Sequence, residues 1–169
     1  MSSELDILHA NLAACGQRIQ KLVYSLNKNR ALFPLTPAGV AALTDDQEES
    51  IDALILRYAQ CVAMIQEQFF RGIAYVERED MSDKSNRDKA RLMEKLGAIE
   101  SADDFGTAAV LRNKFSHHYP EEASLRIERL NLVMAEAEYV ITTFNDILAF
   151  LIRKGFVSSG AQPERLNAS

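Results

Sequence analysis

The residues best suited to chemistry lie close together near position 115. Two of the chain's three histidines fall in residues 111–120, which read LRNKFSHHYP. Arg112 lies five positions before His117, and Tyr119 lies two positions after it. A guanidinium binds phosphate oxygens in a fork geometry, and an imidazole exchanges protons near neutral pH. These residue types in this order predict chemistry on a phosphate ester.

Helix geometry decides which of these side chains can meet. Asn113 and His117 share a face, because they are four residues apart. Arg112 and His117 lie about 140° apart around the axis. The arginine must therefore swing toward the histidine, or a two-fold partner must bring a second pair opposite the first. The negative helix end before Pro120 favours a protonated His117, which suits a general acid.

Such groups suit the cleavage of RNA by its own 2′-hydroxyl. The 2′-oxygen attacks the adjacent phosphorus, a base removes its proton, an acid protonates the leaving 5′-oxygen, and a cation stabilises the phosphorane. The products carry a 2′,3′-cyclic phosphate. This route needs no metal and no cofactor, and DNA is excluded as a substrate because it lacks the nucleophile.

Apolar residues that recur every three or four positions predict the helices that must carry this segment. No alternation typical of β-strands has a useful length. Ser2 or Ser3 is the expected cap of the first helix, and Thr44 with Gln47 has the form of a capping box. The expected helices cover residues 3–30, 45–79, 88–98, 102–118 and a last stretch from Glu121-Glu122 to about Arg153.

These helices predict an all-α fold, an antiparallel up-and-down bundle of four to five helices. One domain is expected over residues 1–157, followed by a frayed tail at 158–169. Several apolar stripes are wider than one protomer can cover, which predicts a homodimer. Cys15 and Cys61 fall on apolar helix positions and are expected to be buried thiols.

Composition limits the classes of function. The chain has 169 residues, 47% of them apolar, and a net charge of −5. No apolar run reaches the roughly 20 residues that span a bilayer, and the first residues lack the basic start of a signal peptide. A cytoplasmic protein without membrane contact is expected. The negative net charge argues against a broad surface that binds nucleic acid. It still allows a small basic site.

The segment resembles a known family. Arg112 to His117 matches the R-x4-6-H motif of the HEPN superfamily, including the polar residue after the arginine, here Asn113. With Tyr119 it takes the R-x4-H-x-Y form of HepT-like proteins. The wider likeness covers residues 90–132, with Leu96, Ile99, Phe105 and Arg126 among the matching positions.

The resemblance implies a fold and an activity. HEPN proteins are helical bundles that dimerise so that two motifs line one cleft. Many are metal-independent endoribonucleases, often toxins of toxin-antitoxin pairs. HepT-like members pair with an MNT-type minimal nucleotidyltransferase, which can adenylylate the motif tyrosine. By this likeness Arg112 and His117 are catalytic, Asn113 supports the site and Tyr119 is the modification target. His118 departs from the family, where a charged residue such as glutamate is common. It either assists catalysis or faces solvent.

The residues themselves also allow plainer interpretations. His117 can be a solvated helix-end histidine, Tyr119 a structural aromatic, and His118 and His9 surface residues. A metal pair of His117 and His118 is disfavoured, because adjacent residues on a helix diverge. Helix caps and solvated or ion-paired helix faces are expected at six charged residues: Asp52, Arg57, Asp103, Asp104, Arg126 and Arg129.

Two functions from different classes therefore stay open, beside a purely structural role. The sequence does not decide whether the chain is an enzyme. One is a ribonuclease toxin, favoured by the intact set of Arg112, His117 and Tyr119. The other is a non-catalytic partner or substrate-binding subunit of a minimal nucleotidyltransferase, favoured by the acidic net charge. A purely structural bundle is the third alternative.

Overall fold

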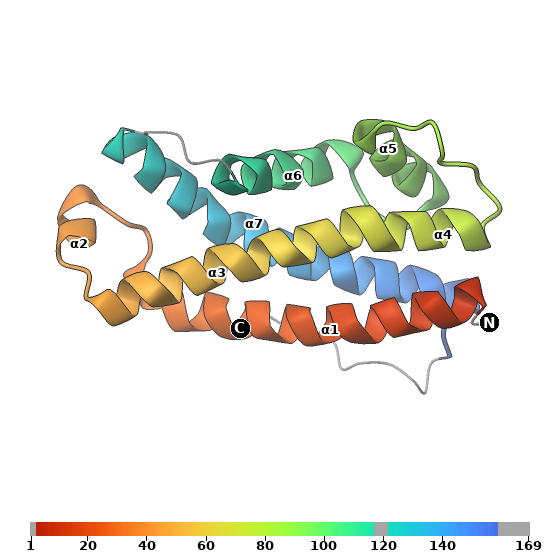
Figure 1. The fold of residues 1–169 in the computed structure, drawn as a ribbon, viewed down its shortest axis with the longest axis horizontal. Helices are drawn as coiled ribbons and strands as arrows, with labels where there is room; N and C mark the ends of the chain where they lie inside the picture. The colour runs from red at the N-terminus through yellow and green to blue at the C-terminus, as the bar shows by residue number, and fades with distance from the viewer. Residues whose placement is uncertain (1–2, 117–121, 159–169) are drawn as a thin grey trace.

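The computed structural model describes residues 3–116 and 122–158 (Figure 1). Helix α1 (Glu4–Asn29) begins at a capping box, in which the Ser3 hydroxyl accepts from the Asp6 N–H at 3.1 Å. The Asp6 carboxylate in turn accepts from the Ser3 N–H at 3.0 Å. These two bonds satisfy N–H groups that the first turn leaves without helical partners. The helix is thereby fixed at its first residue.

A second long rod runs back along α1 (Figure 1). A 3₁₀ turn, η1 (Arg30–Leu32), and the short helix α2 (Pro37–Ala41) lead into it. The rod consists of α3 (Asp45–Met64), a π-helical turn η2 (Ile65–Phe69) and α4 (Phe70–Val76). Arg57 joins the two rods, because its Nη1 donates to the Ser25 hydroxyl at 2.7 Å and to the Lys21 carbonyl at 3.1 Å.

The remaining helices complete the fold around α3. Helix α5 (Asn86–Leu96) ends at Gly97, whose φ of +86° is the left-handed conformation that glycine adopts without strain. Helix α6 (Ala102–Ser116) follows and contacts α3, α5 and α7. Helix α7 (Ala123–Arg153) contacts α1, α3 and α6. Figure 1 shows α6 and α7 running in opposite directions.

The core lies where α1, α3, α4, α6 and α7 face one another. The largest side chains fully buried there are aromatic: Tyr58, Phe69, Phe70, Phe105, Phe144 and Phe150. The rings of Phe69 and Phe144 meet edge to face, with centroids 6.4 Å apart. Burial of apolar area of this kind is the main favourable term in folding. The core therefore fixes α6 and α7 relative to the two rods.

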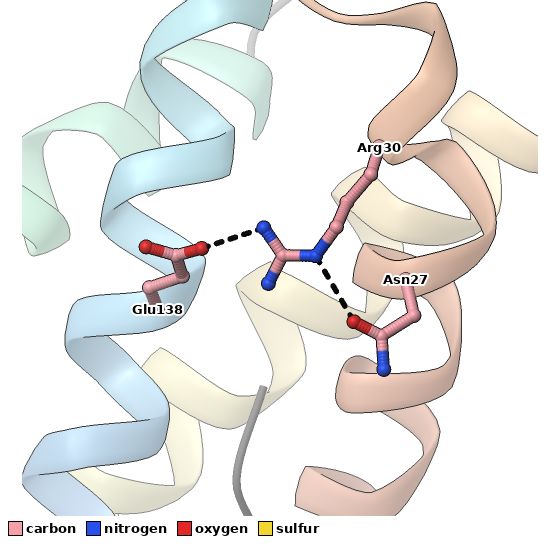
Figure 2. Close-up of polar contacts among 3 residues, drawn as sticks. All are labelled: Asn27, Arg30 and Glu138. Atoms are coloured by element: carbon pink, nitrogen blue, oxygen red, sulfur yellow. Dashed lines mark hydrogen bonds and ion pairs between the residues drawn. The ribbon is translucent and has the colours of Figure 1, made fainter. Parts of the chain in front are cut away.

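Polar side chains tie the end of α1 and the loop after it to α7. Arg30, just after α1, donates from Nη1 to Glu138 on α7 at 2.8 Å and from Nε to Asn27 at 3.1 Å (Figure 2). Nearby, the Asn131 side chain accepts from the Leu35 N–H at 2.7 Å and donates to the Leu35 carbonyl at 3.1 Å. The Asn131 amide thus pairs with both backbone groups of one residue and holds the loop against α7.

The described residues confirm the all-α class, since residues 3–116 and 122–158 contain helices and no strand. Capping by Ser3 and Thr44 and burial of both cysteines are confirmed. No helix within these ranges is long and apolar enough to cross a bilayer.

Several details of the predicted helices were wrong. The helix expected at residues 88–98 is α5, which begins at Asn86 and ends at Leu96, where Gly97 caps it. The second helical rod ends at Val76 rather than 79, and the last helix starts at Ala123 with Glu122 as its N-cap residue. Leu125 is 39% exposed, although its spacing from the other apolar residues of α7 predicts an inward position. The helix has only just begun at this residue.

Candidate functional site

The candidate site is built on α6, which is held from several sides. The Tyr58 hydroxyl on α3 donates to the Ala108 carbonyl at 2.6 Å, in the buried interior. Glu94 on α5 accepts from the Ala102 N–H at 2.7 Å, at the first turn of α6. The Phe105 ring packs on Phe70 with centroids 4.8 Å apart. These contacts leave α6 little freedom to shift or rotate.

A groove of about 600 Å³ runs along α6. Its walls come from the π turn η2, from the start of α5 and from two residues of α7. Arg112, Asn113 and Lys114 line it from α6. Its size matches the clefts that bind small ligands or short stretches of polymer. The other lining residues include Gln66, Glu67, Asn86, Arg87, Asp103, Val110, Leu132 and Glu136.

Arg112 is held partly inside this groove. Its side chain is 25% exposed, and its Nη2 lies 4.0 Å from Oε1 of Glu67. Glu67 is 65% exposed, so water reaches the ion pair from one side. An ion pair this exposed is worth little, typically below about 1 kcal/mol. The pair therefore orients the guanidinium without closing the groove to another anion.

The π turn explains why Glu67 faces Arg112. In η2 the Phe70 N–H bonds to the Ile65 carbonyl five residues back, which accommodates one more residue than an α-helical turn. The residue before Glu67 is Gln66, a buried polar side chain that also lines the groove. Without the extra residue the phase of the helix would change by about 100° at this point. The wide turn thus places an amide and a carboxylate at the site.

The charges of the groove are balanced. Arg87, Arg112 and Lys114 are its basic residues, and Glu67, Asp103 and Glu136 are its acidic ones. Burial raises the pKa of the Glu136 carboxyl above its usual value, and the neighbouring Asp104 raises it further. The groove therefore mixes both signs of charge, with Glu67 beside Arg112, Asp103 on α6 and Glu136 on α7.

The structure brings together part of the predicted set. Arg112 and Asn113 line one groove, as consecutive residues near the end of α6. His117, His118 and Tyr119 lie outside the described residues. Within the described ranges no group of three or more His, Cys, Asp or Glu side chains is arranged to hold a metal ion.

The residue that the sequence did not single out is Glu67. It lies in a stretch whose apolar spacing fits an ordinary helix, and a π turn leaves only a faint mark on that spacing. Cys61, Ile65 and Phe69 are separated by two successive intervals of four, where the preceding intervals alternate between three and four. These two successive intervals of four residues were the one feature of the sequence that could have indicated the π turn.

The chain matches no protein-family model, no curated protein and no solved structure. The likeness to HEPN proteins therefore stands on the motif and its surroundings alone.

Proposed function

We propose that this chain is a HepT-like HEPN protein and a metal-independent endoribonuclease. The observation that carries the proposal is the position of Arg112. Its guanidinium lines a groove of about 600 Å³, partly shielded from water, near the end of the helix that leads to His117. A partly desolvated guanidinium stabilises developing negative charge better than a fully solvated one.

In this proposal each residue of the motif has one task. Arg112 holds the non-bridging phosphate oxygens and stabilises the phosphorane. His117 gives a proton to the leaving 5′-oxygen, and water takes the proton of the attacking 2′-hydroxyl. Asn113 supports the site by hydrogen bonding. Tyr119 is the residue that a nucleotidyltransferase of the MNT type modifies, and His118 assists or faces solvent. No metal and no cofactor take part.

The proposal includes an assembly. The four main helical segments form an antiparallel up-and-down bundle, and two bundles associate so that their motifs share a cleft. The exposed apolar side chains of Val110 on α6 and of Leu125 and Leu132 on α7 support this, since they are 54%, 39% and 47% exposed. The homodimer would act in the cytoplasm as the toxin of a toxin-antitoxin pair, with RNA as substrate.

One observation favours a second candidate. Glu67 already pairs with Arg112, and Asp103 and Glu136 line the same groove. Three carboxylates oppose the approach of an RNA backbone. A non-catalytic HEPN subunit that binds a minimal nucleotidyltransferase has no need to attract phosphate. This alternative uses the same cleft as a protein-binding surface.

The first test is cleavage of an end-labelled RNA in the presence of a chelator. The wild-type chain is compared with Arg112→Ala and His117→Ala, each checked for folding by circular dichroism. His9→Ala is the matched control, because His9 is exposed on α1, where its Nε2 lies 2.6 Å from the Phe156 carbonyl oxygen.

Ribonuclease activity requires cleavage that leaves cyclic phosphate ends, is retained in His9→Ala and is lost in the other two variants. Equal cleavage by all four proteins indicates a contaminant. If no cleavage occurs, the result favours the non-catalytic partner of a minimal nucleotidyltransferase. The test of that function is transfer of labelled AMP to Tyr119 by an MNT-type enzyme, with Tyr119→Phe as control.

A further inference from the structure

A second cavity lies at the other end of the molecule from α5. It measures about 280 Å³ and lies between α2 with the loop after it, the first turns of α3 and the first turns of α7. Ile51 and Leu130 form its floor and are 4% and 5% exposed. Its apolar walls are Val40, Leu43 and Ile127. The volume is at the lower end of the range for ligand sites, enough for one flat ring system.

The walls of this cavity are fixed before any ligand arrives. The Asn131 side chain holds the backbone of Leu35 through two hydrogen bonds, which ties the loop before α2 to α7. Thr44 and Gln47 form a reciprocal capping box that fixes the start of α3. A cavity with a rigid wall loses little entropy when it is filled.

Charged side chains stand around the rim of the cavity. Glu48 and Asp52 are four residues apart on α3, so their carboxylates share a face. Arg126 approaches from α7. None of these three side chains makes a hydrogen bond or an ion pair with another residue of the described ranges. The rim therefore offers hydrogen-bond acceptors on one side and a cation on the other.

The cavity floor is continuous with the end of α6. Leu35, Ile51 and Leu130 form a small buried cluster, and Phe115 packs against it. Phe115 lies two positions before His117. A ligand in the cavity is thus separated from the helix of the RNA-cleaving motif by one layer of apolar side chains.

We propose that this cavity binds a guanine base of single-stranded RNA. Guanine is flat and presents two adjacent N–H donors, N1 and N2, which match the two oxygens of one carboxylate. Asp52 would accept these bonds, Ile127 and Leu43 would contact the ring, and Arg126 would hold the adjoining phosphate. Uracil offers one N–H between two carbonyl oxygens, which a carboxylate repels.

The assignment rests on the RNA-cleaving function proposed above, and it adds to that function a preference for a guanine several nucleotides from the cut. Asp52 and Glu67, the residue beside Arg112, are 15 residues apart on one helical rod, which is about 22 Å. Recognition of an unstacked base by its Watson–Crick edge is the usual way in which proteins read RNA sequence. Arg112 and His117 would supply the chemistry, and Asp52 would decide where along the strand it occurs.

The test measures binding without cleavage. Fluorescent RNA pentamers with 2′-O-methyl groups lack the nucleophile, so they report affinity alone. Their central base is guanine, adenine or uracil, and binding is followed by fluorescence anisotropy. The variants are Asp52→Asn and Val40→Trp, which fills the cavity. Asp46→Asn is the matched control, because Asp46 is exposed in the first turn of the same helix and does not line the cavity.

We expect the guanine pentamer to bind most tightly to the wild-type chain. Asp52→Asn should weaken that complex about fivefold to 150-fold, as for the loss of one bidentate base contact, and should remove the preference for guanine. Val40→Trp should weaken it similarly, and Asp46→Asn should leave it unchanged.

Any one of three results would overturn the proposal. One is equal affinity for the three bases. Another is a guanine preference that survives in Asp52→Asn and Val40→Trp. If sedimentation shows that Val40→Trp instead converts a dimer to a monomer, a second copy of the chain occupies the cavity, and the proposal is wrong. Guanine binding by a chain that cleaves no RNA would refute the proposed ribonuclease and leave the base site standing.

Discussion

The guanidinium of Arg112 and the carboxylate of Glu67 face each other across the groove, with Nη2 and Oε1 4.0 Å apart. The arginine comes from α6 and the glutamate from the π turn between α3 and α4. Any phosphate that binds Arg112 must compete with this carboxylate. Because water reaches Glu67, the competition is weak enough for a doubly coordinated phosphate to win.

Removal of that carboxylate should strengthen RNA binding. We expect Glu67→Gln to lower the dissociation constant for a non-cleavable RNA about twofold to fivefold, since exposed ion pairs are worth up to about 1 kcal/mol. Fluorescence anisotropy at low salt measures the change. Glu49→Gln on α3 is the control, because it removes the same charge at an exposed position outside the groove. Equal gains in both variants would show that only net charge matters.

The hydroxyl of Tyr58 should contribute measurably to stability. It is fully buried and donates to the Ala108 carbonyl, which fixes α6 on α3. We expect Tyr58→Phe to lower the free energy of unfolding by about 1 kcal/mol, the usual net value of one buried hydrogen bond. Urea denaturation followed by circular dichroism gives the number. Tyr24→Phe, at a side chain that is 62% exposed, should change it little. A Tyr58→Phe variant as stable as Tyr24→Phe would contradict the structure.

The raised pKa of Glu136 predicts a pH effect of known sign. Burial first and Asp104 second raise this pKa above the ordinary 4.5, so the folded chain holds the proton more tightly than the unfolded chain. The contribution of Glu136 to the free energy of unfolding therefore falls as the pH rises from about 4.5 through the pKa of the folded state. Glu136→Gln removes the charge, and we expect it to stabilise the fold at about pH 7 by less than about 1 kcal/mol.

The gain should shrink toward about pH 4, where the wild-type carboxyl is itself protonated. Urea titrations at both pH values test this. Glu128→Gln, at an exposed position on the same helix, serves as the comparison. A gain that is constant with pH would show that the effect comes from packing rather than from ionisation.

The two cysteines should be almost unreactive in the folded chain. Both are fully buried, and burial raises the pKa of Cys15 from 9.0 to about 12 and raises that of Cys61 as well. Since only the thiolate reacts, alkylation by iodoacetamide at about pH 8 should be at least about a hundredfold slower than in concentrated urea. Mass spectrometry of timed samples measures both rates. Fast labelling of one cysteine in the native protein would mean that α1 and α3 separate readily.

Much of this fold could be predicted from local signals. Ser3 and Thr44 cap helices because a hydroxyl one position before a helix satisfies its first N–H groups. Gly97 ends α5 because the left-handed conformation costs glycine nothing. The apolar spacing identified the long helices to within a few residues. Each of these signals acts over a few positions and is visible in the chain itself.

The candidate site was less predictable, because it depends on contacts between distant segments. Arg112 and Asn113 could be selected by residue type and order. Glu67 could not, because its place depends on the phase of a helix 45 positions earlier, and an extra residue in one turn decides that phase. The bond from Tyr58 to Ala108 is likewise tertiary. The prediction that places His117 and Tyr119 in the site stays a prediction.

The wide turn at Ile65–Phe69 has a consequence for how such a site changes over time. A π turn accommodates one residue more than the helix needs, and the segments before and after it keep their own registers. Loss of one codon here would restore an ordinary helix and leave Phe69, Phe70 and the packing beyond them in place. It would also turn the acid away from Arg112. Deletion of a single codon would thus change the affinity of the groove for anions while the core keeps its packing.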